Sequence, residues 1–160
     1  MNRFVISFCA LLFFSLSYAT AQPAAEVEQV VTAFLEAISN QDTTAFRATM
    51  VDEASLIALF NRDNQPGYHW RNLDSDVKML GQTKSKFLER MWDPEIKIDG
   101  QLASVWTRYD FYQDGKFSHC GTDAFHVIQT VAGWKISSVV YTIESDPDKC
   151  PESPLGEPEF

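Results

Sequence analysis

The sequence predicts an α+β fold in which N-terminal helices pack on a mainly antiparallel sheet. Apolar side chains recur with helical spacing in residues 24–40, and residues 93–143 hold three runs of alternating polar and apolar residues. Turns at Asp99-Gly100, Asp114-Gly115 and Val131-Ala132-Gly133 close the runs, and each contains a residue suited to a positive φ. We therefore expect a continuous antiparallel meander on which the upstream residues pack.

Residues 1–21 have the composition of a secretory signal peptide. A basic residue, Arg3, precedes an apolar run over residues 4–16, and Ala19-Thr20-Ala21 provides a small-residue cleavage site. The apolar run is too short for a comfortable membrane span. We therefore expect a periplasmic or secreted protein that begins near Gln22 and has no membrane segment after cleavage.

The remaining chain is long enough for one domain and too short for two. We assign it to a domain over residues 22–145 and an irregular, acidic, proline-rich tail over residues 146–160. The formal net charge of −9 argues against nucleic acid as a partner, because phosphate binding needs a basic surface. We expect no metal and no cofactor, since two cysteines without paired spacing do not form a zinc site.

Three helices are predicted before the meander. The first covers Ala24–Asn40, the second begins at Asp42 or Thr43 and reaches Met50, and the third begins at Asp74 or Ser75 and reaches Gln82. The apolar stripe of the first helix consists of Val27, Val30, Val31, Phe34, Leu35 and Ile38.

Strands are predicted on both sides of the third helix. Ser55–Phe60 is one strand, followed by a polar loop over residues 61–67 and an aromatic loop, Tyr68-His69-Trp70, that could roof a pocket. Residues 87–98 are ambiguous between a helical turn and an edge strand broken by Pro94, and we favour the strand.

The Asp114-Gly115 turn sets a testable register for the central hairpin. A two-residue type I′ turn places Tyr112 opposite Phe117, and counting outward places Asp110 opposite His119. One face of the hairpin then carries Trp106, Arg108, Asp110, His119, Asp123, Phe125 and Val127. The other face carries Ala103, Val105, Thr107, Tyr109, Phe111, Cys120, Thr122 and His126. A slip of one residue would undo this grouping.

Two cysteines, Cys120 and Cys150, remain after signal removal, and export would take them to an oxidising compartment. If the last hairpin closes around Val131 and Ala132, Cys120 lies opposite Ile143, and the tail can fold back to it. We therefore expect a Cys120–Cys150 disulfide. The alternative is a buried free thiol at Cys120.

Two stretches resemble a known family. "SNQDTTAF" resembles the helix junction of nuclear transport factor 2-like proteins, and "WDPEIKIDGQLASVWTRYDFYQDGKFSHCGTDAFHVIQTVAGWKI" is similar to their exported members grouped as SnoaL-like or lumazine-binding-like. The resemblance covers about residues 24–145 and implies a cone-shaped fold with a curved sheet. This fold hosts isomerases, dehydratases, cyclases, hydrolases and non-catalytic binders, so it implies no single activity.

The face that carries the polar cluster supplies the candidate site. Asp110 and His119 are the candidate catalytic residues, because a carboxylate can orient an imidazole and tune its pKa; a cross-strand ion pair without function is the alternative. The candidate ligand-binding residues are Trp106, Arg108, Asp123 and Phe125. Arg108 and Asp110 also resemble the Arg-x-Asp pair of limonene epoxide hydrolase relatives, although residues 137–141 lack the second carboxylate of those enzymes.

Three functions follow as alternatives. The first is an exported domain that binds a small molecule in its cone, and the second is an enzyme that performs acid-base chemistry there. The third is a homodimer or partner-binding module that uses an apolar surface around Val105, Tyr109 and Phe111.

Overall fold

The computed structural model describes residues 18–160, with side chains from Gln22 onward, and it confirms the α+β class. Six strands form one sheet in the order β2-β1-β6-β5-β4-β3, and only the β1–β6 pair is parallel. The elements are α1 (Tyr18–Asn40), α2 (Thr43–Ala48), β1 (Met50–Arg62), β2 (Gln65–Asn72), α3 (Leu73–Gln82), β3 (Phe87–Asp99), β4 (Leu102–Gln113), β5 (Lys116–Thr130) and β6 (Gly133–Ile143).

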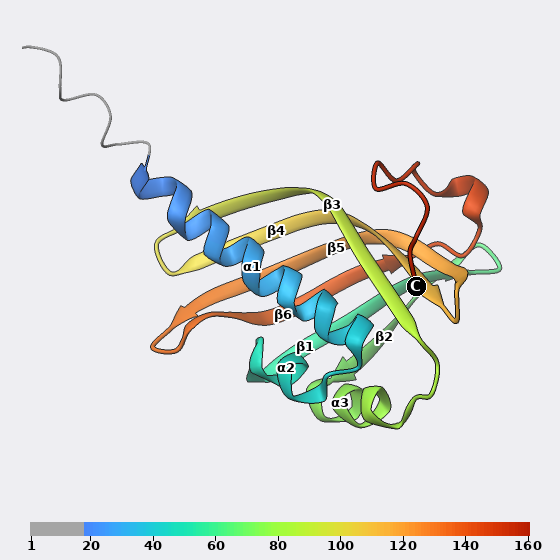
Figure 1. The fold of residues 1–160 in the computed structure, drawn as a ribbon, viewed down its shortest axis with the longest axis horizontal. Helices are drawn as coiled ribbons and strands as arrows, with labels where there is room; N and C mark the ends of the chain where they lie inside the picture. The colour runs from blue at the N-terminus through green and yellow to red at the C-terminus, as the bar shows by residue number, and fades with distance from the viewer. Residues whose placement is uncertain (1–17) are drawn as a thin grey trace, which may run out of the picture.

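The helices cover one face of the curved sheet (Figure 1), which we call the inner face. Helix α1 lies across this face, and α2 and α3 lie near its lower end in the view of Figure 1. The predicted stripe of α1 does face the sheet, because Val27, Val31, Phe34 and Leu35 are buried in the hydrophobic core. Helix α2 begins as expected, since the Asp42 side chain accepts hydrogen bonds from the first backbone N–H groups.

The predicted meander is present as β3 to β6. Asp114 and Gly115 have φ values of 52° and 76°, as a type I′ turn requires, and Gly133 has a φ of 94° in the last hairpin. Residues 87–98 belong to β3, which confirms the strand over the helix. The strand is interrupted at Asp93, where φ is 51°. Its pairing with β4 shifts register between Trp92 and Glu95, on either side of Asp93 and Pro94.

The predicted loops after β1 are wrong. The polar loop over residues 61–67 and the aromatic loop at Tyr68-His69-Trp70 are instead a tight hairpin, in which β2 pairs with β1 from Gln65 onward. Asp63 and Asn64 form the turn with φ values of 53° and 61°. Asp and Asn tolerate this left-handed conformation without glycine, which explains why no turn was recognised.

The tail after β6 is irregular except for a short 3-10 helix at Pro147–Lys149. The Cys120–Cys150 disulfide is confirmed, with the two Cα atoms 6.0 Å apart. The residue opposite Cys120 is Glu144 rather than Ile143. The disulfide holds the tail against the face of the sheet that the helices leave uncovered, which we call the outer face.

The predicted signal peptide falls on residues 1–17, which lie outside the described residues, and on the first four residues of α1. The signal peptide therefore stays a prediction. Within residues 18–160, no helix is both long and apolar enough to cross a membrane.

Candidate functional site

A cavity of about 320 Å³ lies between the inner face of the sheet and the three helices. Its walls are mainly apolar: Phe34, Ile38, Phe46, Leu56, Met79, Leu80, Phe87, Phe111, Val139 and Ile143. Its polar lining consists of Arg71, Asp76, Glu89, Gln113, Ser118, His119, Asp123 and Tyr141. A concave, mainly apolar space with a few convergent polar groups is the usual form of a small-molecule site.

A β-bulge in the central hairpin decides which residues reach this cavity. Tyr112 pairs with Phe117 as predicted, but Phe111 then pairs with His119, which leaves Ser118 as an extra residue in β5. Every later pair is displaced by one residue, so the predicted grouping of one face is wrong. The bulge moves His119, Asp123 and Phe125 to the inner face and leaves Trp106, Arg108 and Asp110 on the outer face.

The predicted acid-base pair of Asp110 and His119 is therefore not formed. Asp110 pairs in register with Cys120 and accepts two hydrogen bonds from Arg90, at 2.9 Å from Nε and 2.6 Å from Nη2. Both side chains of this ion pair are largely buried, and Arg90 also donates to the Gly156 carbonyl of the tail. Asp110 thus belongs to the packing of the tail on the outer face.

The predicted ligand-binding residues also lie on different faces of the sheet. Trp106 is 56% exposed on the outer face, and Arg108 is exposed there and donates to the Thr122 hydroxyl. Phe125 is fully buried on the inner face and packs edge-on against Phe34, which makes it part of the core. Of the four residues, only Asp123 lines the cavity.

Two carboxyl groups meet in the cavity. Glu89 comes from β3 and Asp123 from β5, and burial is the main cause that raises the pKa of both; the pKa of Glu89 reaches about 8. The Glu89 carboxylate further raises the pKa of Asp123, because a like charge nearby disfavours ionisation. Both carboxyl groups therefore keep their protons to a higher pH than an exposed carboxyl group does.

Glu89 was not among the predicted site residues. Its signal in the sequence is local, because Phe87 and Met91 lie two positions away on either side and strand alternation places all three on one face. An acidic residue inside an apolar strand face is the feature to look for. The ambiguity of residues 87–98 between helix and strand obscured this signal for Glu89.

His119 lines the same cavity in an apolar setting. Its ring contacts the rings of Tyr109 and Phe111 at centroid distances of 5.7 and 5.0 Å, and its Nδ1 lies 3.0 Å from the Ser118 hydroxyl. Burial lowers the pKa of His119 to about 4. The imidazole is therefore neutral at physiological pH and brings no positive charge to the cavity.

Arg71 is the one cationic side chain in the lining of the described residues. It comes from β2, and its guanidinium donates to the Asp76 carboxylate at 2.7 Å and to the Tyr141 hydroxyl. Sequence reasoning missed Arg71 because its strand was expected to be a loop.

A second, more open hollow of about 640 Å³ lies between the β1–β2 hairpin and α3, and Arg71, Asp76 and Tyr141 form part of its wall. Both spaces share five lining residues: Arg71, Asp76, Met79, Tyr141 and Ile143. Arg71 therefore borders both spaces.

Two buried carboxylate oxygens have no hydrogen-bond partner within the described part of the chain. They are Oδ2 of Asp76 and Oδ2 of Asp123, and the two side chains belong to residues that are only 4% and 3% exposed. Buried polar atoms are nearly always paired, so such atoms in a cavity wall mark where a ligand or water would bind.

Solved structures identify the fold. A nuclear transport factor 2-like superfamily protein from Salmonella enterica is 19% identical, with a TM-score of 0.64 over 88% of this chain and 99% of its own. A nuclear transport factor 2-like protein from Shewanella baltica is 18% identical, with a TM-score of 0.61 over 78% of this chain and 96% of its own. The beta subunit of a proposed aromatic-ring-hydroxylating dioxygenase from Novosphingobium aromaticivorans is 12% identical, with a TM-score of 0.67 over 88% and 99%.

The chain therefore has the nuclear transport factor 2-like fold, as the sequence resemblance indicated. No protein-family model matches the sequence, and no curated protein is significantly similar to it. At these identities the likeness is one of fold alone.

Proposed function

We propose that this chain is an exported domain that binds a small, largely apolar molecule in the cavity of its nuclear transport factor 2-like fold. The observation that carries the proposal is the cavity itself, whose apolar walls enclose Glu89, His119 and Asp123. A closed core would leave no room for these groups, and burying them without a partner costs free energy. Export is supported by the composition of residues 1–21 and by the disulfide, which is typical of oxidising compartments.

Filling the cavity provides the test. Val139 is 2% exposed and lines the cavity, so Val139→Phe should occupy it, whereas Val131→Phe adds the same side chain at a fully exposed turn. Ligand-observed NMR with indole, phenol and acetophenone should show binding to the wild type and to Val131→Phe, and loss of binding to Val139→Phe. Thermal unfolding of each variant checks that it remains folded. Equal binding to Val139→Phe would place the site elsewhere and overturn the proposal.

Acid-base catalysis is the second candidate, and the pKa of Glu89 near 8 favours it. A carboxyl group that titrates near neutral pH can take a proton from carbon next to a carbonyl, while a protonated Asp123 donates a hydrogen bond to the developing oxyanion. Deuterium uptake at the methyl group of acetophenone in heavy water tests this. Uptake should be faster with the wild type than without protein, and Glu95→Gln, which changes an exposed acid on the same strand, should behave like the wild type. With Glu89→Gln the protein should cause no uptake. Equal rates with and without protein would exclude the chemistry for this carbonyl class.

A homodimer is the third candidate, but the surface expected for it is wrong. Val105 and Tyr109 are each 1% exposed, because they lie under the helices on the inner face. Exposed apolar side chains lie instead on the outer face, where Leu102 and Trp106 are more than half exposed. A dimer would use this face, and sedimentation of the wild type as a monomer at about 50 μM would count against it.

A further inference from the structure

We infer that the cavity selects an organic cation, namely a primary or secondary amine on a compact apolar or aromatic body, with its ammonium group held between Glu89 and Asp123. This inference rests on the proposed small-molecule binding and adds the chemical class of the ligand. The geometry behind it is the convergence of two carboxyl groups, one from the edge strand β3 and one from β5 two strands away, into one mainly apolar cavity.

The balance of charge in the cavity favours a cation. The Arg71 guanidinium is already held by Asp76 and Tyr141, so its charge is largely compensated. Glu89 and Asp123 have no cationic partner among the described residues that line the cavity, apart from the weaker field of Arg71. An ammonium group would compensate the negative charge of the two carboxylates once they give up their protons.

The hydrogen-bonding capacity points the same way. Asp123 Oδ2 is buried and lacks a donor, and a carboxylate can only accept. The other polar groups nearby do not fill this need, because the His119 Nδ1 lies against Ser118 and the Tyr109 hydroxyl donates to the Thr142 carbonyl. A primary ammonium has three donors and can serve both carboxylates at once.

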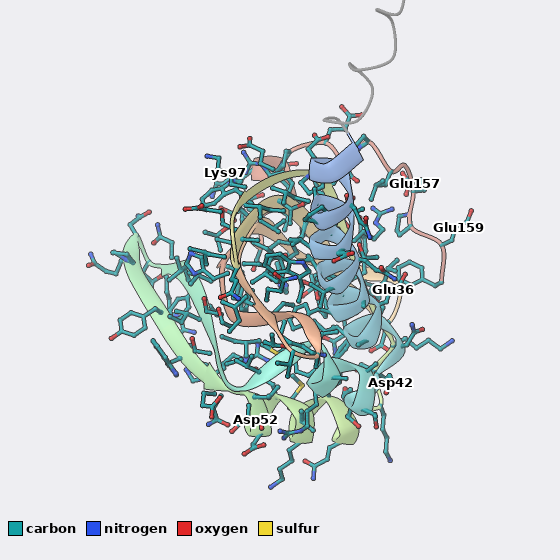
Figure 2. The ribbon with its side chains drawn as sticks, turned by 90° about the vertical axis from the view of Figure 1, so that its left-hand side faces the viewer. Glu36, Asp42, Asp52, Lys97, Glu157 and Glu159 are labelled. Atoms are coloured by element: carbon teal, nitrogen blue, oxygen red, sulfur yellow. A yellow bond between two sulfur atoms is a disulfide. The ribbon has the colours of Figure 1, made fainter. Side chains whose placement is uncertain are left out.

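The walls suit the apolar part of such a ligand. Four phenylalanine rings line the cavity, and they form two contacting pairs: Phe34 with Phe46 at 5.0 Å and Phe87 with Phe111 at 5.2 Å between centroids. Aromatic faces attract cations as well as apolar groups. By contrast, the acidic side chains labelled in Figure 2, such as Glu36, Asp52 and Glu159, point outward and are exposed.

Binding should strengthen as pH rises. Burial raises the pKa of Glu89 to about 8 and raises that of Asp123 as well, so an incoming ammonium must displace their protons. The titratable or charged groups that line the same cavity are Arg71 of β2, Asp76 of α3, His119 of β5 and Tyr141 of β6. Nearby, Tyr109 of β4 stays neutral because burial raises its pKa, and the charge of Asp110 further raises the pKa of Glu89. His119 stays neutral above about pH 5, since burial lowers its pKa to about 4.

Isothermal titration calorimetry with three matched probes tests the inference: phenethylamine, phenethyl alcohol and phenylacetate. Phenethylamine should bind about tenfold or more tightly than the alcohol near pH 8, and phenylacetate should bind least, because a charge-assisted hydrogen bond in an enclosed site outweighs a neutral one. Amine affinity should fall between about pH 8 and pH 6, and titrations in two buffers of different ionisation enthalpy should reveal proton release on binding.

Variants separate the charge effect from general loss of the cavity. Asp123→Asn and Glu89→Gln should each remove most of the preference for the amine while alcohol binding remains. Glu95→Gln, on the same strand as Glu89 but exposed, should bind like the wild type. Alcohol or phenylacetate binding as tight as amine binding, or no amine binding, would overturn the cation inference. Loss of alcohol binding in Val139→Phe would still support the cavity as a small-molecule site.

Discussion

Arg90→Ala is expected to destabilise the protein by about 3–5 kcal/mol, because it leaves the buried Asp110 carboxylate without its cation. The Arg90 side chain is 13% exposed and that of Asp110 is 6% exposed, so solvent screens the pair only weakly. The substitution also removes the hydrogen bond from Arg90 to the Gly156 carbonyl. Urea unfolding monitored by tryptophan fluorescence measures the change.

Arg108→Ala is the matched control. Arg108 lies on the same outer face in β4, but it is exposed and bonds only the Thr122 hydroxyl among the described residues, so its loss should change stability by at most about 0.5 kcal/mol. Similar losses for the two arginines would contradict the structural role assigned to the Arg90–Asp110 pair.

Removal of the disulfide by Cys120→Ser with Cys150→Ser should lower stability by roughly 3–4 kcal/mol, since the bond closes a loop of 30 residues in the unfolded chain. The tail from residue 146 onward should also become sensitive to proteases while the sheet remains intact. Unfolding of the wild type with and without reductant, beside the double variant, measures the stability change, and limited proteolysis of the same samples measures the sensitivity of the tail.

The double variant should be indifferent to reductant, and the reduced wild type should match it. A wild type that reacts with a thiol reagent without unfolding would show that the bond is absent in solution. In that case Cys120 would be the buried thiol that was the alternative expectation.

The sequence predicted the architecture well because its signals were local and repeated. The α1 stripe, the Asp42 cap and the Asp114-Gly115 turn each depend on residues that are close in sequence, and all three are confirmed. The disulfide was predictable because only two cysteines remained after the expected signal cleavage and the meander brought one of them near the tail.

The candidate site was predictable only in part, because one extra residue in β5 moves the following β5 side chains to the face of the sheet opposite to the predicted one. The bulge at Ser118 has no glycine or proline to announce it, and it turned a predicted Asp110–His119 pair into residues on opposite faces. His119 and Asp123 do line the cavity, but their neighbours are Glu89 and Arg71 from the two outermost strands. Neighbours so distant in sequence leave no local pattern.

The parallel pairing of β1 with β6 also constrains the order in which the sheet can be completed. Residues 55–60 of β1 lie beside residues 138–143 of β6, so the two strands come from opposite ends of the domain sequence. Until β6 is available, the β1–β2 hairpin has no strand that joins it to β3, β4 and β5. Closing so long a stretch of chain is a slow, entropically costly step. A chain synthesised only as far as residue 132 therefore lacks the strand that connects the two parts of the sheet and contributes Val139, Tyr141 and Ile143 to the wall of the cavity.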